Sequence, residues 1–173
     1  PDLLLLAGGA EVTADPEGMK AEGVFDLVLP GEGEELLVQV VGRLFQGHPP
    51  EAIQADVQPA PVMDLGTLPC PFLDKTLDPS RYSGMLWELS RGCPFKCDFC
   101  FESRGVAGTR RIPMERLEAE LARFEACGVS QGFVLDPTFN AEPEQAKAIL
   151  RLIARVAPDI HFFFEIRSEF IDA

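Results

Sequence analysis

The sequence predicts an α/β protein that contains part of a doubly wound parallel sheet, followed by the first part of a parallel β/α barrel. Short apolar runs of strand length alternate with stretches in which apolar residues recur every three or four positions, as on one face of a helix. Such alternation of strands and helices is typical of parallel sheets. A proline-rich stretch separates two of these series, so we expect segments at 1–48, 49–82 and 83–173.

The first segment predicts two strands and one amphipathic helix. A buried parallel strand at residues 3–7 ends in the glycine pair Gly8-Gly9, and a second strand covers residues 24–29. The turn Gly31-Glu32-Gly33 then leads into a helix whose apolar face is formed by Leu36, Leu37, Val40, Val41 and Leu44. Glycine supplies positive φ wherever strands end, so turn formation alone also explains the two glycine motifs.

Residues 49–82 are rich in proline and turn residues and are expected to form a linker between domains. Cys70 lies there between two prolines and is interpreted as a structural cysteine. In the third segment we expect strands at 85–89, 132–136 and 160–167. Two helices, at 113–127 and 143–156, have the core faces Met114, Leu117, Leu121, Phe124 and Ile149, Leu152, Ile153, Val156.

Composition excludes several classes of protein. The net charge of −13 weighs against nucleic acid as a partner, and a small basic group (Arg104, Arg110, Arg111) is interpreted as a solvated loop. No apolar run approaches the length of a bilayer span, and no signal peptide is visible. Clustered free cysteines indicate a reducing compartment, so a cytoplasmic protein is expected. The chain begins with Pro1 inside an apolar run, which predicts a fragment of a longer protein.

Three cysteines follow the first barrel strand in the spacing C-x3-C-x2-C: Cys93, Cys97 and Cys100. A closed structural zinc site takes four ligands. Three thiolates can instead hold three irons of a [4Fe–4S] cluster and leave the fourth iron open. A zinc knuckle lacks a fourth ligand with paired spacing, and a two-cluster ferredoxin run has the spacing C-x2-C-x2-C. A chance grouping of structural thiols is the remaining alternative.

The run Cys93-x3-Cys97-x-Phe99-Cys100 resembles the signature of the radical S-adenosylmethionine (SAM) enzymes. This resemblance implies that the amino and carboxylate groups of SAM chelate the open iron and that Phe99 lies beside the adenine. It also implies that one electron, from an external donor such as flavodoxin or ferredoxin, cleaves SAM to methionine and a 5′-deoxyadenosyl radical.

Polar residues follow the second and third barrel strands, and the same resemblance implies that they bind SAM. Asp136 and Thr138 follow the second strand, and Glu165 and Arg167 alternate along the end of the third. The alternatives are an N-cap role for Thr138 or Asn140, which is the preferred interpretation for Asn140, and an ordinary Glu165–Arg167 ion pair.

The first segment resembles the second half of the cobalamin-binding domain that precedes many radical SAM domains, with its doubly wound, flavodoxin- or Rossmann-like sheet. The resemblance implies that Gly8, Gly9, Gly31, Glu32 and Gly33 line the nucleotide tail of cobalamin. The family's Asp-x-His-x-x-Gly motif has no counterpart, since the two histidines, His48 and His161, stand elsewhere.

A radical SAM domain beside a cobalamin domain implies methyl transfer to a small molecule or natural product. A cobalamin-independent oxidoreductase or cyclase, and a non-catalytic iron–sulfur electron-transfer module, are the alternatives.

Overall fold

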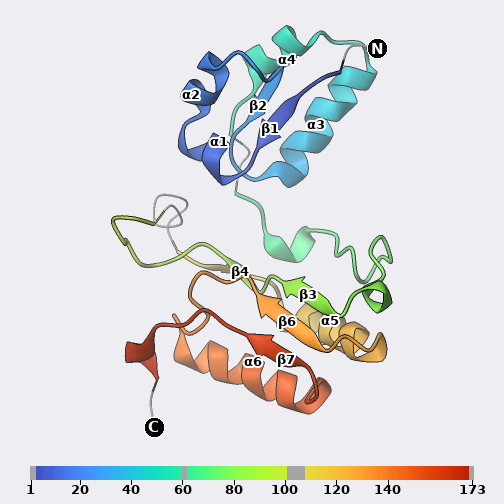
Figure 1. Cartoon of the computed structure of the whole chain (residues 1–173), viewed down its shortest axis with the longest axis vertical. Coiled ribbons are helices and arrows are strands. Elements are labelled where there is room, and N and C mark those ends of the chain that lie inside the picture. Colours follow the sequence, from blue (N-terminus) through green and yellow to red (C-terminus); the bar gives the residue numbers. More distant parts are fainter. Residues whose placement is uncertain (1–2, 60–61, 101–107, 172–173) are drawn as a thin grey trace. The chain divides into compact units, whose positions relative to one another are not determined.

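The computed structural model describes residues 3–59, 62–100 and 108–171 (Figure 1). The chain divides into two compact units, Pro1–Val62 and Met63–Ala173. Both are α/β units with parallel sheets, as the alternation of strands and helices predicts. Among the described residues, no helix is long and apolar enough to cross a membrane.

In the first unit, helices pack on a two-stranded parallel sheet. Its elements are β1 (Leu6–Gly8), α1 (Ala10–Ala14), α2 (Pro16–Ala21), β2 (Leu27–Leu29), α3 (Gly33–Phe45) and α4 (Pro50–Asp56). α2 begins where the carboxylate of Asp15 accepts a hydrogen bond from the backbone N–H of Gly18, with Pro16 at the first helical position. The core consists of Leu27, Leu29, Leu36, Val40 and Ile53.

Helix α4 was not among the predicted elements. Ile53 places its side chain in the core, and Arg43 forms an ion pair with Asp56 at 2.8 Å. The side-chain amide of Gln54 both donates to the carbonyl of Val28 and accepts from its N–H. These contacts attach α4 to the first unit.

Three predictions for this unit are wrong in detail, and one is the second strand, which was expected at residues 24–29 but covers only Leu27–Leu29. The strand at residues 3–7 was expected to be buried, but β1 covers only Leu6–Gly8 and Leu3 is 80% exposed. Within the described part of the chain, β1 pairs with β2 alone, so Leu6 lies on an edge strand. The helical face is also narrower than predicted, because Leu37 is exposed while Leu36 and Val40 are buried.

The second unit is built on a three-stranded parallel sheet with the strand order β3-β6-β7. Its main elements are β3 (Gly84–Trp87), β4 (Ser90–Arg91), β5 (Arg110–Arg111), α5 (Met114–Ala126), β6 (Gln131–Val134), α6 (Pro143–Val156) and β7 (His161–Phe163), with 3₁₀ turns η1 (Leu65–Thr67), η2 (Pro79–Arg81) and η4 (Ser168–Phe170). Trp87, Val134 and the apolar faces of α5 and α6 share one core. The predictions for these two helices are confirmed.

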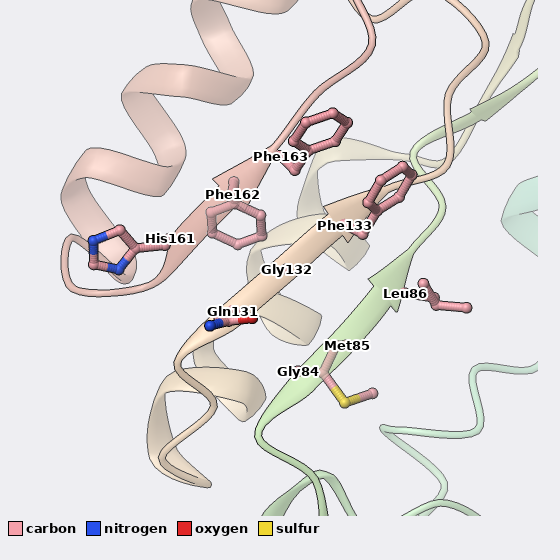
Figure 2. A pocket seen from close by; sticks show the side chains of 9 residues that line it. All are labelled: Gly84, Met85, Leu86, Gln131, Gly132, Phe133, His161, Phe162 and Phe163. Carbon is pink, nitrogen blue, oxygen red and sulfur yellow. The ribbon is translucent and has the colours of Figure 1, made fainter.

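Helices α5 and α6 pack on one face of this sheet, and the opposite face carries exposed side chains. Leu86, Phe133 and Phe163 lie side by side on it, and the rings of Phe133 and Phe163 stack with centroids 4.8 Å apart (Figure 2). These three residues line a shallow pocket together with Gln131 and His161. One sheet face therefore holds the core, and the other carries exposed apolar side chains.

The strand boundaries in this unit differ from the prediction: β3 and β6 each begin one residue earlier and end two residues earlier than the expected 85–89 and 132–136. The third strand was expected to run through residues 160–167, but β7 ends at Phe163, so Glu165 and Arg167 lie in the segment beyond it. The stretch before α5 was expected to be loop, yet Arg110 and Arg111 form β5. A two-residue strand carries no periodicity that a sequence could reveal.

Candidate functional site

The cysteine loop is the segment between β4 and β5 that contains Cys93, Cys97 and Cys100. It begins just beyond the carboxyl end of β3. Ser90 and Arg91 of β4 pair in antiparallel fashion with Arg111 and Arg110 of β5. The backbone N–H of Ile112 adds a hydrogen bond to the carbonyl of Leu89 at 2.9 Å. The short β4–β5 ladder therefore closes the base of the loop, at the end of the sheet where β/α proteins place their active sites.

The three predicted ligands lie on this loop. Cys93, Cys97 and Cys100 are half-buried, and none of them forms a disulfide. Gly92, with a φ of 90°, turns the chain immediately before the first cysteine. The N–H of Cys100 donates to the carbonyl of Cys97 at 3.0 Å, which makes a tight turn between the second and third cysteines.

The donor set fits an iron–sulfur cluster chemically, because cysteine sulfurs outside disulfides are the ligands that such clusters take. Among the described residues, no group of three or more His, Cys, Asp or Glu side chains lies close enough to hold one metal ion together. The thiolates of a [4Fe–4S] cluster bind different irons and so do not converge on one ion. Their role as ligands stays a prediction.

The other two cysteines lie away from this loop. Cys70 is 8% exposed, and burial, followed by a hydrogen bond with Glu120, raises the pKa of its thiol. This environment suits the structural role predicted for it, because a thiolate is disfavoured there. Cys127 follows the last residue of α5 and is half-buried.

Asp136 ties the segment after β6 to the start of the cysteine loop. Its Oδ1 accepts hydrogen bonds from the N–H groups of Leu89 and Ser90 at 2.9 and 3.0 Å, and its Oδ2 accepts from the Ser90 hydroxyl at 2.6 Å. The residue is 5% exposed. Burial raises the pKa of the carboxyl, although these hydrogen bonds act in the opposite direction. The predicted contact with SAM is not tested.

Thr138 and Asn140 reach two further parts of the site. The Thr138 hydroxyl lies 3.8 Å from the thiol of Cys93 and donates to the carbonyl of Pro137 at 2.8 Å. The Asn140 amide donates to the carbonyl of Arg167 at 2.8 Å and accepts from its N–H at 2.9 Å. The preferred N-cap role of Asn140 is therefore wrong, and Glu142 occupies the N-cap of α6.

Arg167 lies against the cysteine loop. Its guanidinium carbon is 4.2 Å from the centre of the Phe95 ring, between the first two cysteines in sequence. The Phe95 ring stacks on Phe170 with centroids 5.7 Å apart. The guanidinium pairs with Glu169 rather than with Glu165, the partner that the ion-pair alternative assumed.

Two predicted SAM contacts lie at the surface. Phe99 is 93% exposed, and Glu165 is exposed while its carbonyl accepts a hydrogen bond from the N–H of Phe139 at 2.9 Å.

At the start of the loop, Arg91 and Glu88 form a two-bond ion pair at 2.7 and 3.0 Å. Of the predicted basic group, Arg104 lies outside the described residues, and Arg111 pairs with Glu142.

The glycine turns predicted for cobalamin lie at the carboxyl ends of β1 and β2. Gly9 and Gly31 have φ of 96° and 90°. Glu32 is the N-cap residue of α3 and Gly33 is its first residue. Gly8 ends β1, opposite Leu29.

Thr13 connects these two turns and was missed by the sequence analysis. Its hydroxyl donates to the carbonyl of Gly9 at 2.7 Å and accepts from the N–H of Gly31 at 2.9 Å. A threonine four residues after a glycine, on the first helical turn, is the sequence signal that accompanies this contact. The turns are thus held together by a side chain from α1.

No protein-family model matches the chain. It is 28% identical over 165 residues to the cobalamin-dependent radical SAM methyltransferase TokK of Streptomyces tokunonensis, an alignment that covers 83% of this chain and 24% of that protein. It is 35% identical over 171 residues to an uncharacterized methyltransferase of Synechocystis, with 96% and 30% covered. The hopanoid C-3 methylase of Methylococcus capsulatus is 28% identical, with 86% and 31% covered.

The chain thus spans about a quarter to a third of the length of these relatives. Over most of its own length it is similar to proteins named as methyltransferases or methylases, one of which is a cobalamin-dependent radical SAM methyltransferase.

Proposed function

We infer that the chain is part of a radical SAM methyltransferase in which the cysteine loop holds a [4Fe–4S] cluster. The observation that supports this most strongly is that the segments after β6 and β7 both contact the loop that follows β3. Asp136 contacts its base, Thr138 its first cysteine, and Arg167 the aromatic residue between the first two cysteines. A loop with three cysteines outside any disulfide, supported in this way, suits a bound cluster with one iron left for SAM.

In this proposal Cys93, Cys97 and Cys100 are the cluster ligands. The bound cluster and SAM supply one-electron cleavage of the sulfonium to a 5′-deoxyadenosyl radical. The chain's own residues orient the ligands and exclude water. Asp136 and Arg167 hold the loop in place. Among the predicted SAM contacts, Thr138, Glu165 and Phe99 have side chains that remain accessible from the loop or the surface.

The first unit is proposed to contribute to cobalamin binding through its two glycine turns. Both turns lie at the carboxyl ends of parallel strands, where ligands of doubly wound sheets bind. Positive φ at Gly9 and Gly31 lets the backbone approach a ligand closely. Cobalamin, when bound, supplies the methyl group, and the name of one relative supports this assignment.

The remaining parts of the proposal concern the whole protein. The three-stranded sheet of the second unit is proposed to be the first part of a β/α barrel, within a longer chain. The substrate is proposed to be a small molecule, the electron donor a flavodoxin or ferredoxin, and the compartment the cytoplasm. The net charge of −13 makes nucleic acid an unsuitable partner.

The test is anaerobic reconstitution of the full-length protein with iron and sulfide, followed by reduction in the presence of SAM. We expect iron–sulfur absorbance, four irons per chain and formation of 5′-deoxyadenosine. Cys97→Ala should abolish the cluster and the formation of 5′-deoxyadenosine, whereas Cys127→Ala, which removes a half-buried cysteine outside the loop, should retain all three results.

The outcomes also separate the alternatives. A cluster that forms without any 5′-deoxyadenosine would indicate an electron-transfer module. Deoxyadenosine formation without bound cobalamin would indicate a cobalamin-independent oxidoreductase or cyclase. A zinc ion in place of iron would contradict the proposal as a whole.

A further inference from the structure

We propose that Arg167 raises the reduction potential of the cluster held by the cysteine loop. This inference rests on the proposed function, because it requires that the three thiolates bind a cluster. It assigns to Arg167 an electrostatic role toward the cluster in addition to any contact with SAM.

The guanidinium is held against the loop from two directions. On the loop side, its central carbon lies 4.2 Å from the Phe95 ring, and that ring is stacked on Phe170. A cation over an aromatic face within about 6 Å is attracted by the ring. On the other side, Asn140, only 8% exposed, fixes the backbone of Arg167 with two hydrogen bonds. Contacts therefore hold both the guanidinium and the backbone of Arg167 in place.

Arg167 contacts the cysteine loop through Phe95 and pairs with the carboxylate of Glu169. The hydrogen bond with Glu169 is the largest cause of the raised pKa of Arg167, and the charges of Glu169, Cys97 and Cys93 raise it further. The guanidinium also lies over the ring of Phe95, which is two residues from both Cys93 and Cys97 in the sequence. Arg91, which precedes the loop, is bound in a two-bond ion pair to Glu88.

Reduction of the cluster by a low-potential one-electron donor adds one electron and therefore one negative charge at the thiolate loop. A neighbouring cation stabilises the more negative, reduced state and raises the potential. Glu169, whose carboxylate binds the same guanidinium, opposes this effect. The Arg167 side chain is 37% exposed, so water and salt screen the interaction and it should weaken at high ionic strength.

The experiment is a redox titration of the reconstituted full-length protein without SAM, with dithionite as the donor and the reduced cluster followed by electron paramagnetic resonance. Arg167→Gln should shift the potential to more negative values. At a fixed potential we expect a roughly tenfold lower ratio of reduced to oxidised protein, which is about 59 mV for one electron. Glu169→Gln should shift it in the opposite direction, and Arg167→Lys should stay near the wild type.

A role limited to loop support predicts a different pattern. Phe95→Leu removes the ring that supports the guanidinium but keeps its charge, so its shift should be smaller than that of Arg167→Gln. The difference between wild type and Arg167→Gln should also shrink as salt is added. If Arg167→Gln does not take up iron, the positive shift in Glu169→Gln carries the test.

The inference is overturned if Arg167→Gln leaves the potential unchanged, or if it and Glu169→Gln shift it in the same direction. This result differs from failure of the proposed function, in which the wild-type protein itself forms no iron–sulfur absorbance. In that second case there is no cluster for Arg167 to act on, and both proposals are wrong.

Discussion

Asp136, Thr138 and Asn140 show how single side chains connect parts of the site. They alternate along one short segment after β6 and contact the base of the cysteine loop, the first cysteine and the backbone of Arg167. Asp136 and Thr138 were predicted to be site residues because polar side chains at the end of a strand can bind a ligand. The sequence analysis did not find their partners, because those partners lie more than 40 positions earlier in the chain.

Asp136→Ala should destabilise the chain and loosen the cysteine loop. It removes the acceptor for two backbone N–H groups and for the Ser90 hydroxyl in a buried position. Each buried donor left without a partner costs about 1–3 kcal/mol, so we expect a loss of about 3 kcal/mol in urea unfolding.

Asp136→Asn is the matched control, because its amide oxygen can still accept from both N–H groups. It should lose much less stability than Asp136→Ala. Equal losses in the two variants would mean that packing, and not these hydrogen bonds, accounts for the effect.

The raised pKa of Asp136 predicts a pH dependence with a definite sign. The folded state holds this proton to higher pH than the unfolded state does. The contribution to stability is therefore complete below the ordinary aspartate pKa of about 3.9 and is lost as the pH rises through the raised value. The free energy of unfolding of the wild type relative to Asp136→Asn should fall from about pH 4 towards neutrality. A difference that grows with pH in urea titrations would contradict this.

Glu120 is a buried acidic residue with several polar partners, among them the Cys70 thiol described above. It is 2% exposed, accepts from the Trp87 indole N–H at 2.8 Å and pairs with Arg116 at 2.8 Å. Arg116 in turn donates to the carbonyls of Leu65 and Leu68. The helical pattern of α5 places Glu120 beside the core face but gives no indication of these partners.

Glu120→Ala should cost about 3–5 kcal/mol, because it leaves the Arg116 charge and the Trp87 N–H without their acceptor. The measurement is urea unfolding followed by tryptophan fluorescence, since Trp87 is the only tryptophan in the sequence. Glu125→Ala, on an exposed part of the same helix, is the control and should change stability by less than about 0.5 kcal/mol.

At the scale of elements, the long helices could be predicted and the short pieces could not. α5 and α6 have 13 and 14 residues, enough for a helical repeat of apolar side chains to be visible. β5 has two residues, and α4 lies in a stretch whose prolines predicted a linker. Pro50 instead occupies the first position of α4, where a helix tolerates proline.

The connection between the two glycine turns supplies an element-scale prediction. Thr13→Val removes the hydroxyl that joins the carbonyl of Gly9 to the N–H of Gly31. We expect a loss of about 1–2 kcal/mol in urea unfolding, because two hydrogen bonds disappear from a half-buried position. In the full-length protein, cobalamin content after purification should fall as well.

Thr13→Ser keeps the hydroxyl and is the matched control. It should retain most of the stability and of the bound cobalamin. If Thr13→Val and Thr13→Ser behave alike, the bridge does not position the turns.

At the scale of the whole molecule, the sequence established the class of fold and a candidate cofactor. Parallel strands alternate with helices in both units, and the cysteines follow the first strand of the second unit, as predicted. The support of the cysteine loop could not be predicted, because it depends on side chains that follow β6 and β7 and reach the loop after β3 only once the sheet has formed. The similarity to named methyltransferases agrees with the proposed chemistry but leaves the substrate open.

The most direct test of the central claim is the electron paramagnetic resonance spectrum of the reduced, reconstituted full-length protein with and without SAM. If one iron of a three-cysteine cluster is open to SAM, adding SAM must change the spectrum of the reduced cluster. We predict such a change in the wild type and in Cys127→Ala. A spectrum that does not respond to SAM would show that no iron is available to it, and the proposed radical chemistry would then be wrong.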